Sequence, residues 1–330
     1  MRAVVITKPG GPEVLEVREV ETPRAGAGQV RVRIHACAVN RADLMQVRGM
    51  YPAPADAPQD IPGLEVAGEI DEVGTGVTEL AIGDRVYGVV SGGAYAESVV
   101  VPARTLARMP KELDFLQAAA VPEAFVTAYD AMVVQAGLAA GDVALVNAVG
   151  SGVGTAAVQI VRAIGARSIG TARTAAKLER ARELGMNDGI VVITKNGQPE
   201  LASKVMEVTE GRGADVCLEL VGGSYVPESL RALAMRGRLV LVGLLAGIAA
   251  EIDLSLVLRR RLHLFGTMLR SRPLEEKILA AQMLQHNLTP LFASGTLKPI
   301  VERVFPLEKA GEAHAYLAAN EGFGKLVLQI

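Results

Sequence analysis

Several residue types are scarce or absent in this chain of 330 residues, and each shortage excludes a class of protein. There is no tryptophan, aromatic residues make up 4%, and the formal net charge is −2. The chain therefore offers neither the basic surface nor the stacking side chains that nucleic-acid binding requires. No apolar run reaches the roughly 18 residues of a membrane span, and the apolar start is too short for a signal peptide. We expect a soluble, cytoplasmic protein.

Cysteine and histidine are also few. Cys37 and Cys217 lie far apart and stand in no Cys-x-x-Cys or Cys/His spacing, and the four histidines are scattered. Zinc cages and disulfide frameworks require clustered ligands or paired cysteines. The sequence therefore predicts two buried, unreactive cysteines and no histidine that acts as a catalytic base.

The most informative stretch that is present covers residues 142–159. A short apolar run at 143–146 is typical of a strand buried on both faces of a parallel sheet. Gly150, Gly152 and Gly154 follow it directly, and small apolar residues typical of a helix come next. Such a turn directs backbone N–H groups and the positive end of a helix at one point, which suits a pyrophosphate. The spacing is not the G-x-G-x-x-G pattern, so a glycine-rich turn without a ligand is an alternative.

The order of predicted elements indicates two domains, as the length suggests. Residues 1–110 contain short strands separated by Gly/Pro turns, which is typical of a barrel-type β domain. From residue 116 onward strands and helices alternate, which predicts a doubly wound parallel sheet of six strands. These strands are 143–146, 168–172, 189–193, 215–221, 238–243 and 262–266, with helices at 175–184, 200–209, 224–235 and 254–260 between them. A helical segment follows at 274–295, and strands at 301–305 and 325–330 return to the first domain.

Short motifs are spread along the whole chain. They are NRADLMQ at 40–46, GLEVAG at 63–68, GDRV at 83–86, PEA at 122–124, SGVG at 151–154, GGSY at 222–225 and LRSR at 269–272. Together they resemble the medium-chain dehydrogenase/reductase superfamily, and within it the zinc-free quinone oxidoreductases of the p53-inducible and zeta-crystallin-like type. The resemblance implies a GroES-like β-barrel catalytic domain (1–122 and 268–330), a Rossmann domain (123–267) and a cleft between them.

The same resemblance shows which metal ligands the chain lacks. The zinc alcohol dehydrogenases of the superfamily have a cysteine in the stretch that here reads Val39-Asn40-Arg41, and a histidine where Leu64 stands. The cysteines of their structural zinc lobe have no counterpart at 85–105. Without these soft ligands the resemblance implies no metal and an acceptor that is electrophilic by itself, a quinone or an activated enone.

Two residues are the candidates for catalysis. Asn40 stands in the place of the lost cysteine. Tyr51 follows a helix-like segment and precedes a proline-rich loop, so its hydroxyl can bond the nicotinamide ribose or the acceptor oxygen, or its ring can simply pack against that loop. Asp43 is interpreted as a helix-start carboxylate rather than a proton donor.

The end of the second Rossmann strand indicates the cofactor. NAD-binding domains place an acid there, about twenty residues past the glycine turn, to bind the 2′-hydroxyl. Here the segment 170–177 reads GTARTAAK and has no carboxylate. Arg173 and Lys177 can converge on a 2′-phosphate, and without an anionic ligand they would oppose the helix dipole. The sequence therefore predicts NADPH. The predicted contacts, taken partly from the resemblance, are Tyr51, Thr127, Ser151, Gly152, Val153, Gly154, Thr171, Arg173, Lys177, Gly222, Gly223, Gly243, Leu244, Leu245, Thr267, Met268 and Leu269.

The resemblance implies an NADPH-dependent quinone oxidoreductase that transfers hydride without zinc. Two alternatives stay open, a 2-enoyl thioester or enone reductase on the same scaffold and a non-enzymatic NADPH-binding protein. By the same resemblance we expect a homodimer that pairs through the strand at 262–266 and its neighbour at 238–243.

Overall fold

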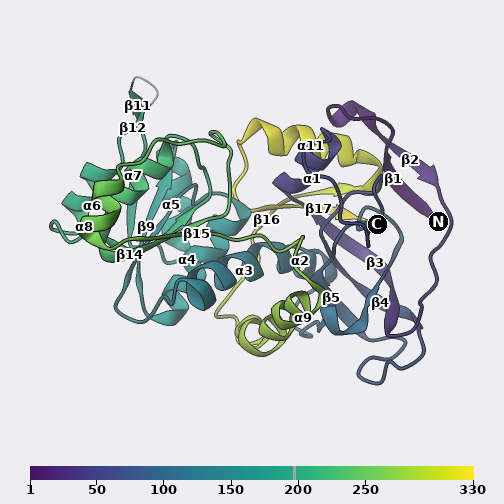
Figure 1. The fold of residues 1–330 in the computed structure, drawn as a ribbon. Helices are drawn as coiled ribbons and strands as arrows, with labels where there is room; N and C mark the ends of the chain where they lie inside the picture. The colour runs from purple at the N-terminus through teal and green to yellow at the C-terminus, as the bar shows by residue number, and fades with distance from the viewer. Residues whose placement is uncertain (196–197) are drawn as a thin grey trace. The chain divides into compact units, whose positions relative to one another are not determined.

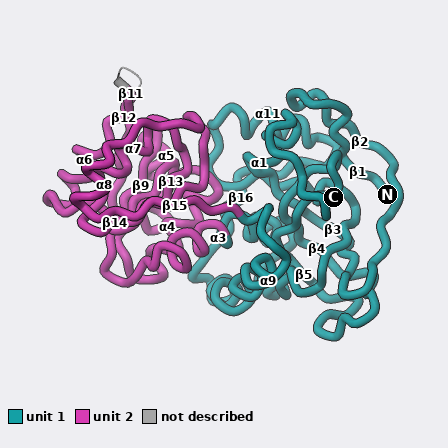
Figure 2. Tube along the Cα trace, in the orientation of Figure 1, with its two compact units in different colours: residues 1–126, 269–330 teal, residues 127–268 magenta. Residues whose placement is uncertain are grey.

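The computed structural model describes residues 1–195 and 198–330 (Figure 1). The chain forms two compact units (Figure 2). Unit 1 comprises residues 1–126 and 269–330, and unit 2 comprises residues 127–268. The boundaries inferred from sequence were 122/123 and 267/268. No helix in the described part of the chain is long and apolar enough to cross a membrane.

Unit 1 is built on a seven-stranded sheet to which the end of the chain returns. Its order is β16 (Val301–Pro306), β17 (Lys325–Gln329), β3 (Gln29–Val39), β4 (Glu65–Val73), β5 (Arg85–Val89) and β7 (Ala107–Arg108), with β6 (Ser98–Pro102) on β3. A separate hairpin joins β1 (Arg2–Ile6) to β2 (Leu15–Glu19). In the antiparallel pairing of β17 with β3, Leu326 lies opposite Val39. This register places Lys325 beside Asn40, although the two are far apart in sequence.

Unit 1 also contains helices, which lie between and after these strands in the chain. They are α1 (Arg41–Val47), α2 (Phe115–Ala119), the start of α3 (Pro122–Tyr129), α9 (Leu274–Met283), α10 (Thr289–Ala293) and α11 (Ala310–Ala319). The helical segment predicted at 274–295 agrees with the structure, in which a π-helical turn at Leu284–Leu288 separates α9 from α10. Pro290 lacks a backbone N–H, so the regular hydrogen-bond ladder cannot continue through it.

Unit 2 is a parallel six-stranded sheet. Its order is β10 (Asp188–Val191), β9 (Arg167–Ala172), β8 (Val143–Val146), β13 (Ala214–Glu219), β14 (Leu233–Leu241) and β15 (His263–Gly266). The crossover helices are α4 (Gly152–Ile164), α5 (Ala175–Glu183), α6 (Ala202–Val208), α7 (Tyr225–Arg231) and α8 (Leu254–Arg260), and α3 continues into a π-helical segment at Asp130–Gln135. The strand order reverses between β8 and β13, which is where Rossmann folds bind dinucleotides. The predicted fold class is confirmed.

One boundary in unit 2 was predicted wrongly. The helix expected at 224–235 ends at Arg231, and β14 begins already at Leu233. The register between β13 and β14 shifts, so that Ala214 pairs with Leu233 and Val216 with Arg238. Arg236 has a φ of 61° within the resulting bulge. The residues of such a bulge do not alternate regularly between apolar and polar side chains. The sequence pattern of the helix therefore appeared to continue past Arg231. The short antiparallel pair of β11 (Thr194–Lys195) and β12 (Gln198–Pro199) was also not predicted.

Candidate functional site

The turn after β8 is shaped by its last glycine and its serine. A Cβ added to Gly154 would lie 2.5 Å from the carbonyl oxygen of Ala148, so only glycine lets α4 start this close to the turn. Ser151 is the N-cap of α4, and its Oγ accepts the N–H of Gly154 at 3.0 Å. A hydroxyl can donate while it accepts, so its proton can still bond a phosphate oxygen. The turn therefore fits a pyrophosphate, with the N–H groups of Gly152 and Val153 in the first helical turn.

The end of β9 carries cations and no carboxylate. Arg173 follows the strand and is exposed, and the half-buried Lys177 lies in the first turn of α5. The first acid along α5, Glu179, forms an ion pair with Arg182. Burial, followed by the charge of Glu219, raises the pKa of Tyr225 at the start of α7, and the guanidinium of Arg173 opposes this shift. These groups fit a 2′-phosphate better than a 2′-hydroxyl.

A buried carboxylate ties three of the loops in unit 2 together. Glu219 ends β13 and is fully buried, and its Oε2 accepts from Asn147 Nδ2 at 2.7 Å and from Ser229 Oγ at 2.6 Å. Its Oε1 accepts the N–H groups of Val221 and Gly222 at 2.8 and 3.0 Å. Asn147 Oδ1 in turn accepts from Thr171 Oγ1 at 2.9 Å. The ends of β8, β9 and β13 are thus held by one hydrogen-bond network, which we call the Glu219 network.

The loops after β13 and β14 pack closely because of their glycines. Gly222 and Gly223 have φ values of 72° and 52°. Cβ atoms there would lie 2.9 Å from Gly243 O and 2.5 Å from Ala246 O. Three more of the predicted cofactor residues are exposed, namely Leu244, Leu245 and Met268. Thr267 accepts a hydrogen bond from Gln135 Nε2 at 2.7 Å, and Thr127 is buried. The structure therefore brings most of the predicted cofactor residues to unit 2, whereas Tyr51 and Leu269 belong to unit 1.

In unit 1 a buried ion pair surrounds Asn40. Lys325 Nζ donates to Glu65 Oε1 at 2.7 Å, to Asn40 Oδ1 at 2.6 Å and to the carbonyl of Val39 at 3.3 Å. Asn40 Nδ2 donates to Glu65 Oε1 at 2.8 Å, so both ends of its amide are engaged. Glu65 is fully buried and Lys325 is 5% exposed. The ammonium group of Lys325 thus supplies the positive charge beside Asn40. The catalytic role of Asn40 stays a prediction.

The side chains present do not fit a zinc ion. Leu64 is buried in the core and has no donor atom. Within residues 1–195 and 198–330, no group of three or more His, Cys, Asp and Glu side chains could hold a metal. Both cysteines are buried, and burial raises their pKa well above the usual value, as expected of unreactive thiols.

Asp43 lies in the first turn of α1, as predicted, and joins a buried polar chain. Its carboxylate accepts from the backbone N–H of Asn40 at 2.7 Å, from that of Gly63 at 3.2 Å and from the hydroxyl of Tyr95 at 3.2 Å. The Tyr95 hydroxyl lies 3.0 Å from His314 Nε2. Burial raises the pKa of Asp43 to about 6, and burial lowers the pKa of His314 to about 4. The imidazole is therefore neutral near pH 7.

Tyr51 is held by Arg270. The guanidinium carbon lies 5.2 Å from the centre of the tyrosine ring, and Nη1 donates to the carbonyl of Tyr51 at 3.3 Å. Arg270 also donates to Gln46 Oε1 at 2.7 Å and to the carbonyl of Ser91 at 2.8 Å. Burial, followed by the charge of Glu123, raises the pKa of the half-buried Tyr51, so its hydroxyl keeps its proton. Its role toward a nicotinamide or an acceptor stays a prediction.

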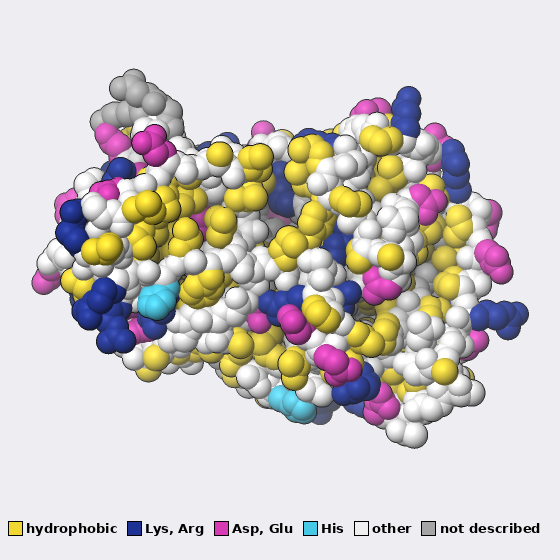
Figure 3. Space-filling model, viewed as in Figure 1, with side chains coloured by type: hydrophobic (Ala, Val, Ile, Leu, Met, Phe, Trp, Pro, Cys, Tyr) yellow, Lys and Arg dark blue, Asp and Glu magenta, His cyan; other side chains and the backbone are white. Residues whose placement is uncertain are grey.

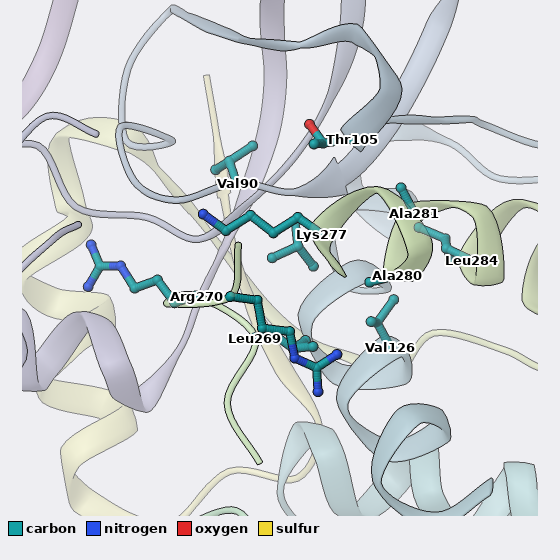
Figure 4. Close-up of a pocket in the computed structure, with 11 residues that line it drawn as sticks. Val90, Thr105, Val126, Leu269, Arg270, Lys277, Ala280, Ala281 and Leu284 are labelled. Atoms are coloured by element: carbon teal, nitrogen blue, oxygen red, sulfur yellow. The ribbon is translucent and has the colours of Figure 1, made fainter. Parts of the chain in front are cut away.

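A pocket next to Arg270 is too small for a nicotinamide ring or for an acceptor such as a quinone (Figure 4). Its free volume is about 20 Å³, which is room for one water molecule. Lys277 extends across it from α9 and donates to Ser91 Oγ at 2.7 Å. Its lining consists of Val89, Val90, Thr105, Val126, Leu269, Arg270, Arg272, Lys277, Ala280, Ala281 and Leu284. On the face in Figure 3, basic and acidic side chains are interspersed over most of the surface, and several basic side chains gather at its left edge beside a histidine.

Sequence reasoning missed the buried polar residues that support both sites. Asn147, Glu219 and Tyr225 in unit 2, and Glu65 and Lys325 in unit 1, were not among the predicted site residues. A polar residue directly at the end of a buried strand was the available signal for Asn147 and Glu219. No local pattern marked Lys325, because its partners come from distant parts of the chain.

Comparison with known proteins agrees with this geometry. Residues 26–111 match the alcohol dehydrogenase GroES-like domain, and residues 152–285 match the zinc-binding dehydrogenase family. Quinone oxidoreductase of Homo sapiens is 33% identical over 332 residues, covering 99% of this chain and 97% of the relative. The crystal structure of Escherichia coli quinone oxidoreductase complexed with NADPH has a TM-score of 0.88 at 28% identity, and that of an NAD-dependent alcohol dehydrogenase has 0.86 at 34%. Each of these two alignments covers 100% of both chains. The chain therefore belongs to the medium-chain dehydrogenase/reductase superfamily, as a quinone oxidoreductase-like member.

Proposed function

We propose that this protein is an NADPH-dependent quinone oxidoreductase that reduces quinones or similar activated carbonyl and enone acceptors without a metal. The observation that carries the proposal is the arrangement around Asn40, where Lys325 and Glu65 engage the amide and Leu64 offers no ligand. These side chains cannot hold a metal that would polarise an alcohol. An acceptor that is electrophilic by itself needs only to be positioned.

The residues of unit 2 support a bound nicotinamide dinucleotide. NADPH supplies the hydride when it is bound. Ser151 and the first turn of α4 bind its pyrophosphate, and Arg173 with Lys177 binds its 2′-phosphate. The glycines at 222, 223 and 243 let the loops after β13 and β14 come close to each other and to the adenosine half.

Replacing Arg173 by alanine is expected to raise the KM for NADPH about ten- to a hundredfold and to leave that for NADH nearly unchanged, because only the 2′-phosphate contact is lost. Steady-state kinetics with both cofactors measures the change. Arg180→Ala, which removes an exposed arginine from the helix α5 that follows Arg173, is the control. Equal effects of Arg173→Ala on both cofactors would show that the arginine is structural.

An acceptor panel tests the proposed activity against the two alternatives. Turnover of quinones such as 1,2-naphthoquinone, compared with small enones and crotonyl-CoA, separates a quinone reductase from an enoyl thioester reductase. Binding of NADPH without turnover of any acceptor would favour a binding protein.

A cytoplasmic location stays a prediction.

We also propose a homodimer that forms through β15. This strand is at the edge of the sheet, and Leu264 on it is 41% exposed. Exposed strand edges pair readily with a second copy. Light scattering is expected to give twice the mass of one chain, and Leu264→Lys is expected to shift the protein toward the monomer. A monomer mass for the unmodified protein at micromolar concentration would contradict the proposal.

A further inference from the structure

The carboxyl group of Glu123 takes part in none of the hydrogen bonds described so far. Glu123 stands in the first turn of α3, and its backbone N–H donates to Glu65 Oε2 at 2.8 Å. The residue is half-buried, but its Oε2 is buried and has no hydrogen-bond partner among the described residues. A buried polar atom without a partner is costly, so such an atom indicates a missing partner.

Charged and titratable groups from several elements lie near Glu123. Glu65 on β4 and Asp43 on α1 are acidic, Lys325 on β17 and Arg270 are basic, and the phenol of Tyr51 also interacts with Glu123. Glu65 is bonded by Lys325 and Asn40, and Asp43 by two backbone N–H groups and Tyr95. Three carboxyl groups thus face two cations. The charges balance when one carboxyl keeps its proton, and Glu123 is the one whose Oε2 has no donor.

The ionisation of Glu123 agrees with this balance. Burial, followed by the negative charge of Glu65, raises its pKa to about 8. The start of a helix favours a carboxylate, but burial and the neighbouring acids outweigh that effect. At pH 7 the group is therefore a carboxylic acid that can donate a hydrogen bond.

We propose that Glu123 is the general acid of the reaction and gives its proton to the reduced oxygen of the acceptor. This inference rests on the proposed function. The acceptor is reduced by the hydride that NADPH would supply when bound, which leaves NADP⁺, and the O–H bond of Glu123 breaks as an O–H bond forms on the acceptor oxygen. A quinone becomes a hydroquinone, and Glu123 is left as a carboxylate that takes a proton from water before the next turnover. The acceptor oxygen is the partner that Oε2 lacks.

Glu123→Gln tests this role, because glutamine keeps the shape but has no acidic proton. At pH 7 we expect kcat with NADPH and a quinone to fall about a hundredfold, which is at the lower end of the rate enhancement that a general acid usually contributes. NADPH binding, followed by its fluorescence, should not change. The kcat of the unmodified enzyme should fall as pH rises through about 8, whereas that of Glu123→Gln should not respond. Glu123→Asp should retain a pH-dependent rate, and Glu112→Gln, an exposed acid, serves as control.

Infrared difference spectroscopy gives a readout that does not depend on turnover. The protein without cofactor should show the C=O band of a protonated carboxylic acid at pH 7, lost above about pH 8 and absent from Glu123→Gln. Absence of this band in the unmodified protein would overturn the proposal. Full kcat with an unchanged pH profile in Glu123→Gln would overturn the acid role alone. A band without turnover of any acceptor would overturn the proposed function, and the acid role with it.

Discussion

Replacing Lys325 by methionine is expected to lower the free energy of unfolding by about 3–5 kcal/mol, because it removes one partner of a buried ion pair. Methionine has a similar length but no charge. It would leave the carboxylate of Glu65, which is fully buried, with only Asn40 and the N–H of Glu123 as donors. Urea unfolding measures the loss.

Two variants control this experiment. Lys309→Met removes an ammonium group that pairs with Glu312 at 3.0 Å while both side chains are more than half exposed, so it should cost less than about 1 kcal/mol. The double variant Lys325→Met/Glu65→Gln removes the stranded charge and should be more stable than Lys325→Met. A loss as small as that of Lys309→Met would show that the pair is solvated.

Much of the fold could be predicted from the sequence because its signals are local. The strand at 143–146 and the helix at 254–260 agree with the structure at both ends. Apolar runs, glycine stops and turn residues mark them within a few positions. The main error falls where a local pattern is misleading, at the bulge around Arg236.

The candidate sites likewise contain residues that a local sequence pattern marks and residues that no local pattern marks. The glycine turn and the cations after β9 are contiguous in sequence, so their pattern could be recognised. The polar pairs were not predictable, since Lys325 and Glu65 are 260 positions apart, and Asn147 and Glu219 are 72 apart. Only the register of β17 on β3, and the adjacency of β8 and β13, bring these partners together.

Removing the carboxylate of the Glu219 network is expected to lower the free energy of unfolding nearly as much as removing the ammonium group of Lys325. Glu219→Ala removes the acceptor of Asn147 Nδ2, of Ser229 Oγ and of the N–H groups of Val221 and Gly222. Each unsatisfied buried donor costs about 1–3 kcal/mol, and water entering the space recovers part of this. We expect a loss of roughly 3–5 kcal/mol in the free energy of unfolding, with weaker NADPH binding, since the ends of β8, β9 and β13 lose their common tie.

Glu219→Gln separates the shape of this side chain from its charge. Its carbonyl oxygen can still accept the N–H groups of Val221 and Gly222, while its NH₂ group faces Asn147, so we expect a smaller loss of about 1–2 kcal/mol. Glu183→Ala, which removes an exposed acid from α5, is the control. Urea unfolding and NADPH titration of all three variants measure both effects. If Glu219→Ala unfolds and binds NADPH like Glu183→Ala, the three loops are held by their backbone packing, and the carboxylate contributes nothing to the cofactor site.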